Sequence, residues 1–152
     1  MTGRVEAIFV SPEATVLPAE VDRVRAVAGR GLEGDRYFTD GGTWSDHPIR
    51  NGRSLTLIEA EAIERAPLSA AEARRNVVTR GISLGDLVGK RFRIGAVECA
   101  GRRLCEPCSH LEGLTRPGVV EALAHTGLRA DVLTDGEIAV GDGLVALDDF
   151  DG

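Results

Sequence analysis

Residues 91–101 read Arg-Phe-Arg-Ile-Gly-Ala-Val-Glu-Cys-Ala-Gly, and this stretch gives the clearest indication of the fold. Two short runs, 91–95 and 97–101, have the composition of β-strands, and Gly95 lies at the tight turn between them. A glycine turn between two strand-like runs is typical of a β-hairpin. The stretch therefore predicts a pair of antiparallel strands in the second half of the chain.

Similar runs occur on both sides of this hairpin. Further strands are predicted over 4–10, 21–27, 54–58, 76–79, 130–133, 138–140 and 144–147. Short helices are predicted over 59–66, which Pro67 ends, and over 115–126, and the polar stretch 38–53 is a candidate for a mobile loop. About nine short strands with two or three small helices predict a mainly β fold, a closed or nearly closed β-barrel.

The composition agrees with one small domain over residues 1–152. The chain has 19 glycines but only one Trp, one Tyr and four Phe, which suits tight turns and short strands. The net charge of −6 repels a phosphate backbone, so nucleic acid is not expected as a partner. No apolar run approaches the roughly 18 residues of a bilayer span, and no signal peptide follows Met1. We therefore expect a cytoplasmic protein with no membrane partner.

Lysine is nearly absent, since Lys90 is the single lysine among 18 basic residues. A pyridoxal-phosphate enzyme needs a lysine to form its Schiff base. Lys90 falls in a predicted turn, 88–91, before a strand. We therefore expect that this chain alone binds no pyridoxal phosphate.

The motif Cys105-Glu-Pro-Cys108 is the first candidate for chemistry. A Cys-x-x-Cys can be half of a zinc site, a redox dithiol, a reactive thiolate or two unreactive thiols. Structural zinc is disfavoured because no second Cys-x-x-Cys or His-x-His pair offers the remaining ligands. Ser109 and Glu112 form a capping-box pattern, and a helix start there would stabilise a thiolate at Cys108. Cys99, within a predicted strand, is expected in the core.

Two polar clusters are candidates for binding an anion. The first is Gly34-Asp35-Arg36 at a glycine turn, and the second is Arg74-Arg75-Asn76 at the entrance to a strand. Their alternatives are an ion pair that closes a loop and a solvated strand end. Arginine forks and backbone N–H groups at glycine turns suit a phosphate or another oxyanion. Neither cluster has the spacing of a Walker or Rossmann loop.

Taken in order along the chain, these segments resemble MOSC domains, the C-terminal domains of molybdenum cofactor sulfurases. The likeness runs from about residue 4 to residue 147. The segments that carry it are 31–36 (Gly-Leu-Glu-Gly-Asp-Arg), 54–58, 75–81 (Arg-Asn-Val-Val-Thr-Arg-Gly), 89–95, 105–108 and 138–142.

The resemblance implies a β-barrel of the pyruvate-kinase type and a role with sulfur or molybdenum cofactor. The key cysteine would be Cys108, either as a persulfide carrier or as a molybdenum ligand. The cofactor-binding residues would be Gly34, Asp35, Arg36, Arg75 and Asn76, and these should converge with Cys108 on one cavity. The implied partners are a small or pterin-type anionic ligand and a separate cysteine desulfurase or molybdoenzyme. The alternatives are a lyase or reductase acting on a small sulfur or nitrogen compound, and a non-catalytic metallocofactor-binding module.

Overall fold

A computed structural model of the chain describes residues 2–11, 19–35, 55–65, 75–104 and 126–149. Its elements in chain order are β1 (Thr2–Val10), β2 (Ala19–Val21), β3 (Arg23–Val27), β4 (Gly31–Leu32), β5 (Leu55–Glu59), α1 (Ala60–Arg65), β6 (Val77–Arg80), the 3₁₀ turn η2 (Leu84–Leu87), β7 (Lys90–Ile94), β8 (Val97–Leu104), β9 (Gly127–Val132), β10 (Gly136–Ala139) and β11 (Gly143–Asp149).

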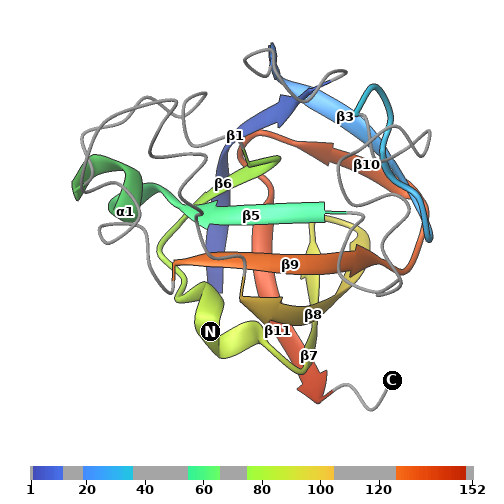
Figure 1. Cartoon of the computed structure of the whole chain (residues 1–152). Coiled ribbons are helices and arrows are strands. Elements are labelled where there is room, and N and C mark those ends of the chain that lie inside the picture. The colour runs from blue at the N-terminus through green and yellow to red at the C-terminus, as the bar shows by residue number, and fades with distance from the viewer. Residues whose placement is uncertain (1, 12–18, 36–54, 66–74, 105–125, 150–152) are drawn as a thin grey trace.

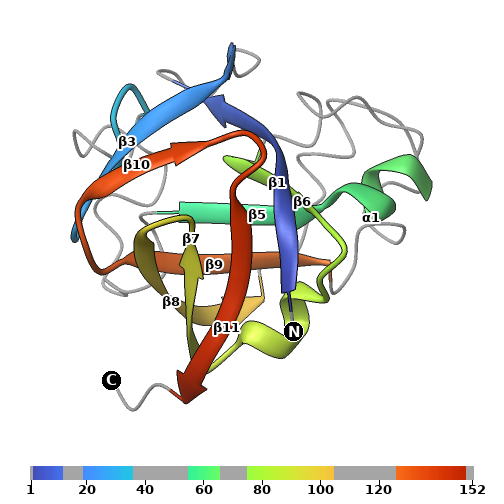
Figure 2. The same cartoon turned by 180° about the vertical axis from the view of Figure 1, so that it is seen from behind.

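Seven of these strands form a closed barrel (Figures 1 and 2). The neighbours run β11, β7, β8, β9, β5, β6 and β1, and β1 pairs with β11 to close the ring. The pair β5–β6 is parallel, and the other barrel pairs are antiparallel. The fold predicted from the sequence, a mainly β closed barrel with few helices, is confirmed.

A small second sheet, in the order β10-β3-β4, lies beside one end of the barrel (Figure 1). Its buried residues Val24, Leu32 and Ile138 belong to the same apolar cluster as the barrel interior. The two sheets therefore share one apolar core.

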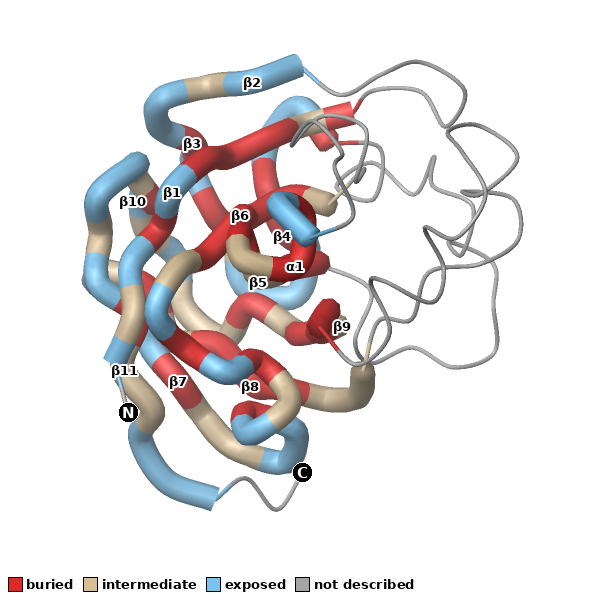
Figure 3. Tube along the Cα trace, turned by 90° about the vertical axis from the view of Figure 1, so that its left-hand side faces the viewer, coloured by how far each residue is buried: buried red, intermediate tan, exposed pale blue. Residues whose placement is uncertain are grey.

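The barrel interior follows the alternation of side chains along each strand. On β9, Leu128, Ala130 and Val132 are buried in the core, while Arg129 and Asp131 occupy the alternate, outward positions. In Figure 3, buried segments of the barrel strands lie between less buried ones. This inside–outside assignment decides which polar side chains can take part in a site on the outer face.

One glycine is required by close packing rather than by its backbone angles. A Cβ at Gly101 on β8 would overlap the carbonyl oxygen of Leu87, the last residue of η2. The backbone of Gly89 also donates to the Gly101 carbonyl at 2.9 Å. The 3₁₀ turn can therefore lie directly against β8, and a larger residue would push it away.

The predicted hairpin is confirmed, with Ile94 opposite Val97 and Phe92 opposite Cys99. The predicted strand 21–27 is instead two strands, because the chain bends at Asp22 and changes sheets: β2 pairs with β1, and β3 pairs with β10. The predicted helix near 59–66 is α1. The predicted loop 38–53 and residues 115–125 of the predicted helix lie outside the described residues, and Thr126 directly precedes β9. Within the described parts of the chain, no helix is long and apolar enough to cross a membrane.

Candidate functional site

Asp35, the middle residue of the first polar cluster, has a buried side chain. It follows β4 and the glycine turn at Gly34, whose φ of +88° lies in the left-handed region that glycine adopts without strain. The Asp35 backbone N–H donates to the Leu32 carbonyl at 3.1 Å, which closes the turn. Its carboxylate oxygen Oδ1 accepts the backbone N–H of Ser11 at 2.9 Å. Asp35 thereby ties the end of β4 to the residue that follows β1.

Asn76 stands one residue before β6 and makes four side-chain hydrogen bonds. Its Oδ1 accepts the backbone N–H and the hydroxyl of Thr56 on β5, both at 3.1 Å. Its Nδ2 donates to the Phe9 carbonyl at 3.1 Å and to Asp35 Oδ1 at 3.2 Å. An amide offers two acceptor and two donor positions, so these bonds use its full capacity.

The structure thus brings together two clusters that lie 41 positions apart in the sequence, through the Asp35–Asn76 contact. Both side chains are buried, and so are Ser11 and Thr56 around them. A buried polar network in which every amide position is used rigidifies its surroundings. Asp35 and Asn76 therefore act here as positioning residues, which hold the start of β6 against β1, β4 and β5.

The other residues implied by the resemblance have different placements. Arg75 is described, half-buried, at the entrance to β6 next to Asn76, and its Nε is shielded from solvent. Arg36, Cys105 and Cys108 lie outside the described residues.

Strand register adds two arginines that the sequence did not indicate. On the outer face of the barrel, Arg103 of β8 is the direct partner of Arg129 of β9, and Arg129 is the partner of Thr56 of β5. Thr56 in turn bonds to Asn76, whose neighbour is Arg75. We call Arg103 and Arg129 on this face, together with Arg75 beside Asn76, the arginine row. The alternation of side chains along β9 could have predicted that Arg129 points outward. Only the register between β8 and β9 shows that it lies opposite Arg103.

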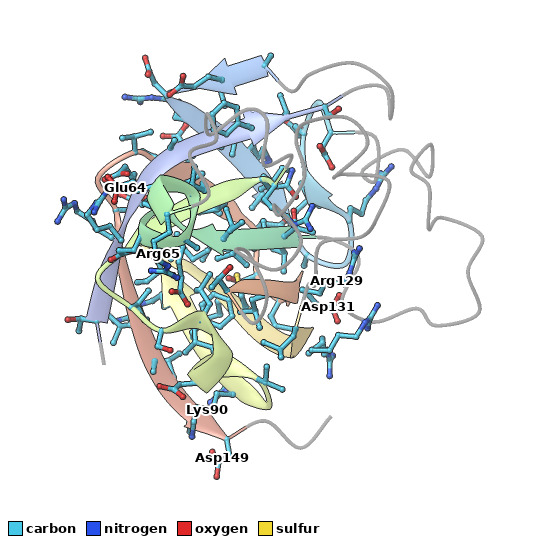
Figure 4. The ribbon with its side chains drawn as sticks, turned by 60° about the vertical axis from the view of Figure 1, so that its left-hand side comes forward. Glu64, Arg65, Lys90, Arg129, Asp131 and Asp149 are labelled. Carbon is cyan, nitrogen blue, oxygen red and sulfur yellow. The ribbon has the colours of Figure 1, made fainter. Side chains whose placement is uncertain are left out.

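A bulge in β8 also turns Arg102 to the outer face. The register between β8 and β9 shifts between Gly101 and Arg103, so one residue is inserted there. Arg102 Nε lies 2.7 Å from Asp131 Oδ2, and both side chains are only 16% exposed. Figure 4 shows Arg129 and Asp131 side by side, far from Glu64 and from the Lys90–Asp149 pair. This outer face therefore carries Arg102, Arg103 and Arg129 together with Asp131, in a chain of net charge −6.

The end of β8 belongs to the same region. Leu104 pairs with Leu128, Leu128 with Leu57, and Leu57 with Val77, so one row crosses four strands from the end of β8 to the start of β6. Cys105 follows Leu104 directly in the sequence. The Cys-x-x-Cys motif is therefore attached to the strand that carries Arg102 and Arg103.

Cys99 is a different kind of thiol. It lies fully buried in the barrel core, as its place in a predicted strand indicated. Desolvation by burial, with smaller contributions from Asp131 and Glu98, raises the pKa of the Cys99 thiol far above its usual range. A thiol that stays protonated is a poor nucleophile. Cys99 is therefore a core side chain, and no group of three or more metal-ligating side chains occurs among the described residues.

Comparison of the sequence with protein-family models identifies the family of this chain. The MOSC domain model matches residues 50–145, which is more than half of the chain, and this chain belongs to the MOSC domain family. The matched region includes the entrance to β6, the arginine row and the Cys-x-x-Cys motif. No curated protein sequence matches the chain.

Solved structures share the fold at low sequence identity. YuaD from Bacillus subtilis superposes with a TM-score of 0.73 and 16% identity, covering 95% of this chain and 94% of that one. YiiM from Geobacillus stearothermophilus gives 0.70 and 17%, with 96% and 75% covered. YiiM from Escherichia coli gives 0.66 and 17%, with 100% and 72% covered. These likenesses establish the barrel and its connectivity.

Proposed function

We propose that this MOSC domain handles sulfane sulfur or molybdenum cofactor through the Cys108 thiolate, beside an anion site lined by arginines. The observation that carries the proposal is the contact between Asp35 and Asn76. It holds the backbone at the entrance to β6, where Arg75 directly precedes Asn76. Cys108 follows Arg103 by five positions.

The sulfur reaction needs only a nucleophilic thiolate and a persulfide donor. The Cys108 sulfur attacks the outer sulfur of the donor, and a new S–S bond forms as the S–S bond of the donor breaks. The electron pair leaves with the donor thiolate, and the proton stays on the transferred sulfur. A soft, polarisable thiolate suits this displacement. A cysteine desulfurase is the kind of partner that would supply such a donor.

The arginine row fits the anionic part of a pterin cofactor. Guanidinium groups bind phosphate through paired N–H donors, and the half-buried setting of Arg75, Arg103 and Arg129 strengthens such contacts. Cys108 offers the soft sulfur that molybdenum accepts. The cofactor, when bound, would supply redox chemistry. The protein would hold its phosphate and orient it through Arg75, whose position Asn76 fixes.

The decisive experiment is purification of the full chain from a host that makes molybdenum cofactor. Bound molybdenum is measured by elemental analysis, and labile sulfur is measured by cyanolysis after incubation with a cysteine desulfurase and L-cysteine. We expect sulfur or molybdenum near one per chain in the wild type and in Cys105→Ser. We expect its loss in Cys108→Ser. Equal loading of Cys108→Ser would contradict the proposal.

A second measurement addresses the thiol itself. Timed alkylation followed by peptide mass spectrometry should label Cys108 faster than Cys105 and Cys99, because a helix start after Cys108 would favour its thiolate. Equal or slower labelling of Cys108 would argue against it as the sulfur carrier. Stoichiometric zinc that resists a mild chelator would favour a structural role for the motif instead.

A further inference from the structure

We infer that Glu59 and Glu61, which we call the carboxylate pair, form a pH-sensitive switch that controls opening of the connector leading into η2. The connector is residues 81–84, from the end of β6 to the first residue of η2. It is held closed when the carboxylate pair takes up a proton, and it opens more easily as the pH rises. The switch is independent of the chemistry proposed for Cys108.

The two carboxylates hold the connector at its two ends. Glu61 Oε2 accepts the backbone N–H of Gly81 at 3.0 Å, and Glu59 Oε2 accepts the backbone N–H of Leu84 at 3.1 Å. Glu59 is the last residue of β5, and Glu61 is the second residue of α1. The carboxylate pair therefore ties the connector to a barrel strand and to the helix that follows it.

The connector leads to a part of the core. Leu84 and Leu87 of η2, together with Ile82 in the connector, belong to the apolar cluster of the barrel interior. The turn η2 packs against β5, β7 and β9, and its last residue lies against Gly101 of β8. Opening of the connector therefore exposes apolar surface, and the two hydrogen bonds oppose it. Segments of this kind open locally at a lower free energy than the whole fold.

The surroundings of Glu59 disfavour its charge. Its side chain is half-buried, and desolvation raises the pKa of Glu59, with further contributions from the charges of Glu61 on α1 and Asp86 on η2. The Leu84 N–H and the charge of Arg65 act in the opposite direction but do not outweigh these effects. Glu61 Oε1 is buried without a hydrogen-bond partner among the described residues, which adds to the cost of keeping both carboxylates charged.

The direction of the pH effect follows from linkage. Glu59 binds a proton more tightly when the connector is closed than when it is open, because water then reaches the carboxyl group and its pKa returns to the ordinary range. The closed state is therefore favoured at low pH. Opening becomes easier as the pH rises from the ordinary carboxyl range to the raised pKa of Glu59, and it changes no further above that value.

The same helix offers a matched control carboxylate. The Glu64 side chain is 62% exposed, and its Oε2 accepts from Arg80 Nη2 at 3.1 Å. Arg80 on β6 is also held by Glu6 at 2.6 Å, so it keeps a carboxylate partner when Glu64 is neutralised. Glu64→Gln therefore removes one negative charge from α1 without removing a hydrogen bond to the connector.

The test is amide hydrogen exchange of the full chain between pH 5 and pH 8, followed by nuclear magnetic resonance at Gly81 and Leu84 and corrected for the intrinsic exchange rate at each pH. In the wild type we expect the protection of Leu84 to fall as the pH rises, tenfold for each unit by which the pKa of Glu59 is raised. We expect the same direction at Gly81. Amides in β8 and β9 report global unfolding, and their protection should change less with pH.

Three variants separate the carboxylate pair from other charges. Glu59→Gln is neutral at every pH and keeps an oxygen that can accept the Leu84 N–H, so protection of Leu84 should no longer depend on pH. Glu61→Gln removes a charge that raises the pKa of Glu59, so the fall in protection should be smaller. Glu64→Gln should keep the wild-type dependence.

Three outcomes would overturn the inference. The first is protection of Leu84 in the wild type that stays constant or increases as the pH rises. The second is a pH dependence that persists in Glu59→Gln. The third is an equal pH dependence in β8 and β9, which would assign the effect to global unfolding. Loading of Cys108 with sulfur or molybdenum is measured separately, so failure of the proposed function would leave the switch standing.

Discussion

Replacing Asn76 with Asp is the sharpest perturbation of the network that positions the site. The substitution keeps the size of the side chain and one oxygen, but it replaces Nδ2 with a second oxygen. That oxygen would face the Phe9 carbonyl at about 3.1 Å and Asp35 Oδ1 at about 3.2 Å, where the amide now donates. Two ionised carboxylates at this separation repel by about 5 kcal/mol at an effective dielectric constant near 20.

The folded variant can relieve this repulsion by binding one proton between Asp35 and the introduced carboxyl group. The loss of unfolding free energy then depends on pH. Holding a proton on a carboxyl of ordinary pKa costs about 4 kcal/mol at pH 7 and about 1.5 kcal/mol at pH 5. The folded variant then binds more protons than the unfolded chain, so its stability falls as the pH rises. We expect Asn76→Asp to lose about 4 kcal/mol of unfolding free energy at pH 7 and much less at pH 5.

Urea unfolding of the wild type and the variant at both pH values measures this difference. Asn76→Ala is the matched control. It leaves buried groups on Thr56, Phe9 and Asp35 without the amide and should cost about 1–3 kcal/mol for each group, with a weaker dependence on pH than Asn76→Asp. A loss for Asn76→Asp that is below 1 kcal/mol at pH 7, or equal at pH 5 and 7, would refute the buried Asp35–Asn76 contact.

Three further predictions concern the barrel. Cys99 should resist alkylation in native buffer and react only on unfolding, because burial raises its pKa; mass spectrometry of the native protein checks this. Desolvation raises the pKa of Glu59, so charging it costs stability as the pH rises through the folded value. Glu59→Gln should therefore be more stable than wild type at pH 7, with the gap closing toward pH 4 in thermal melts. Gly101→Ala should lower the unfolding free energy by about 2–3 kcal/mol, because the new methyl group would overlap the Leu87 carbonyl. Gly143→Ala is the control and should change it little, because a Cβ there would lie 3.9 Å from the nearest atom, the Gly3 carbonyl oxygen. Urea titrations of both variants measure the difference.

The sequence by itself determined the fold class and much of its outline. Short β-branched runs separated by glycine turns predicted the barrel strands, and Pro67 together with an alanine- and glutamate-rich run predicted α1. The order of the motifs indicated the MOSC family, to which the family model assigns residues 50–145. These features were accessible because strand propensity, turn residues and motif order are local properties of the chain.

Tertiary structure alone decided how the polar residues meet. The alternation of apolar and polar residues along a strand indicates which side chains point out of the barrel. It does not indicate which strands are neighbours or in what register they pair. The register placed Arg103 opposite Arg129, and a bulge after Gly101 set that alignment. The contact between Asp35 and Asn76 joins segments 41 positions apart. Such contacts depend on how the whole sheet closes on itself, because each strand is positioned by its neighbours and not by its own residues.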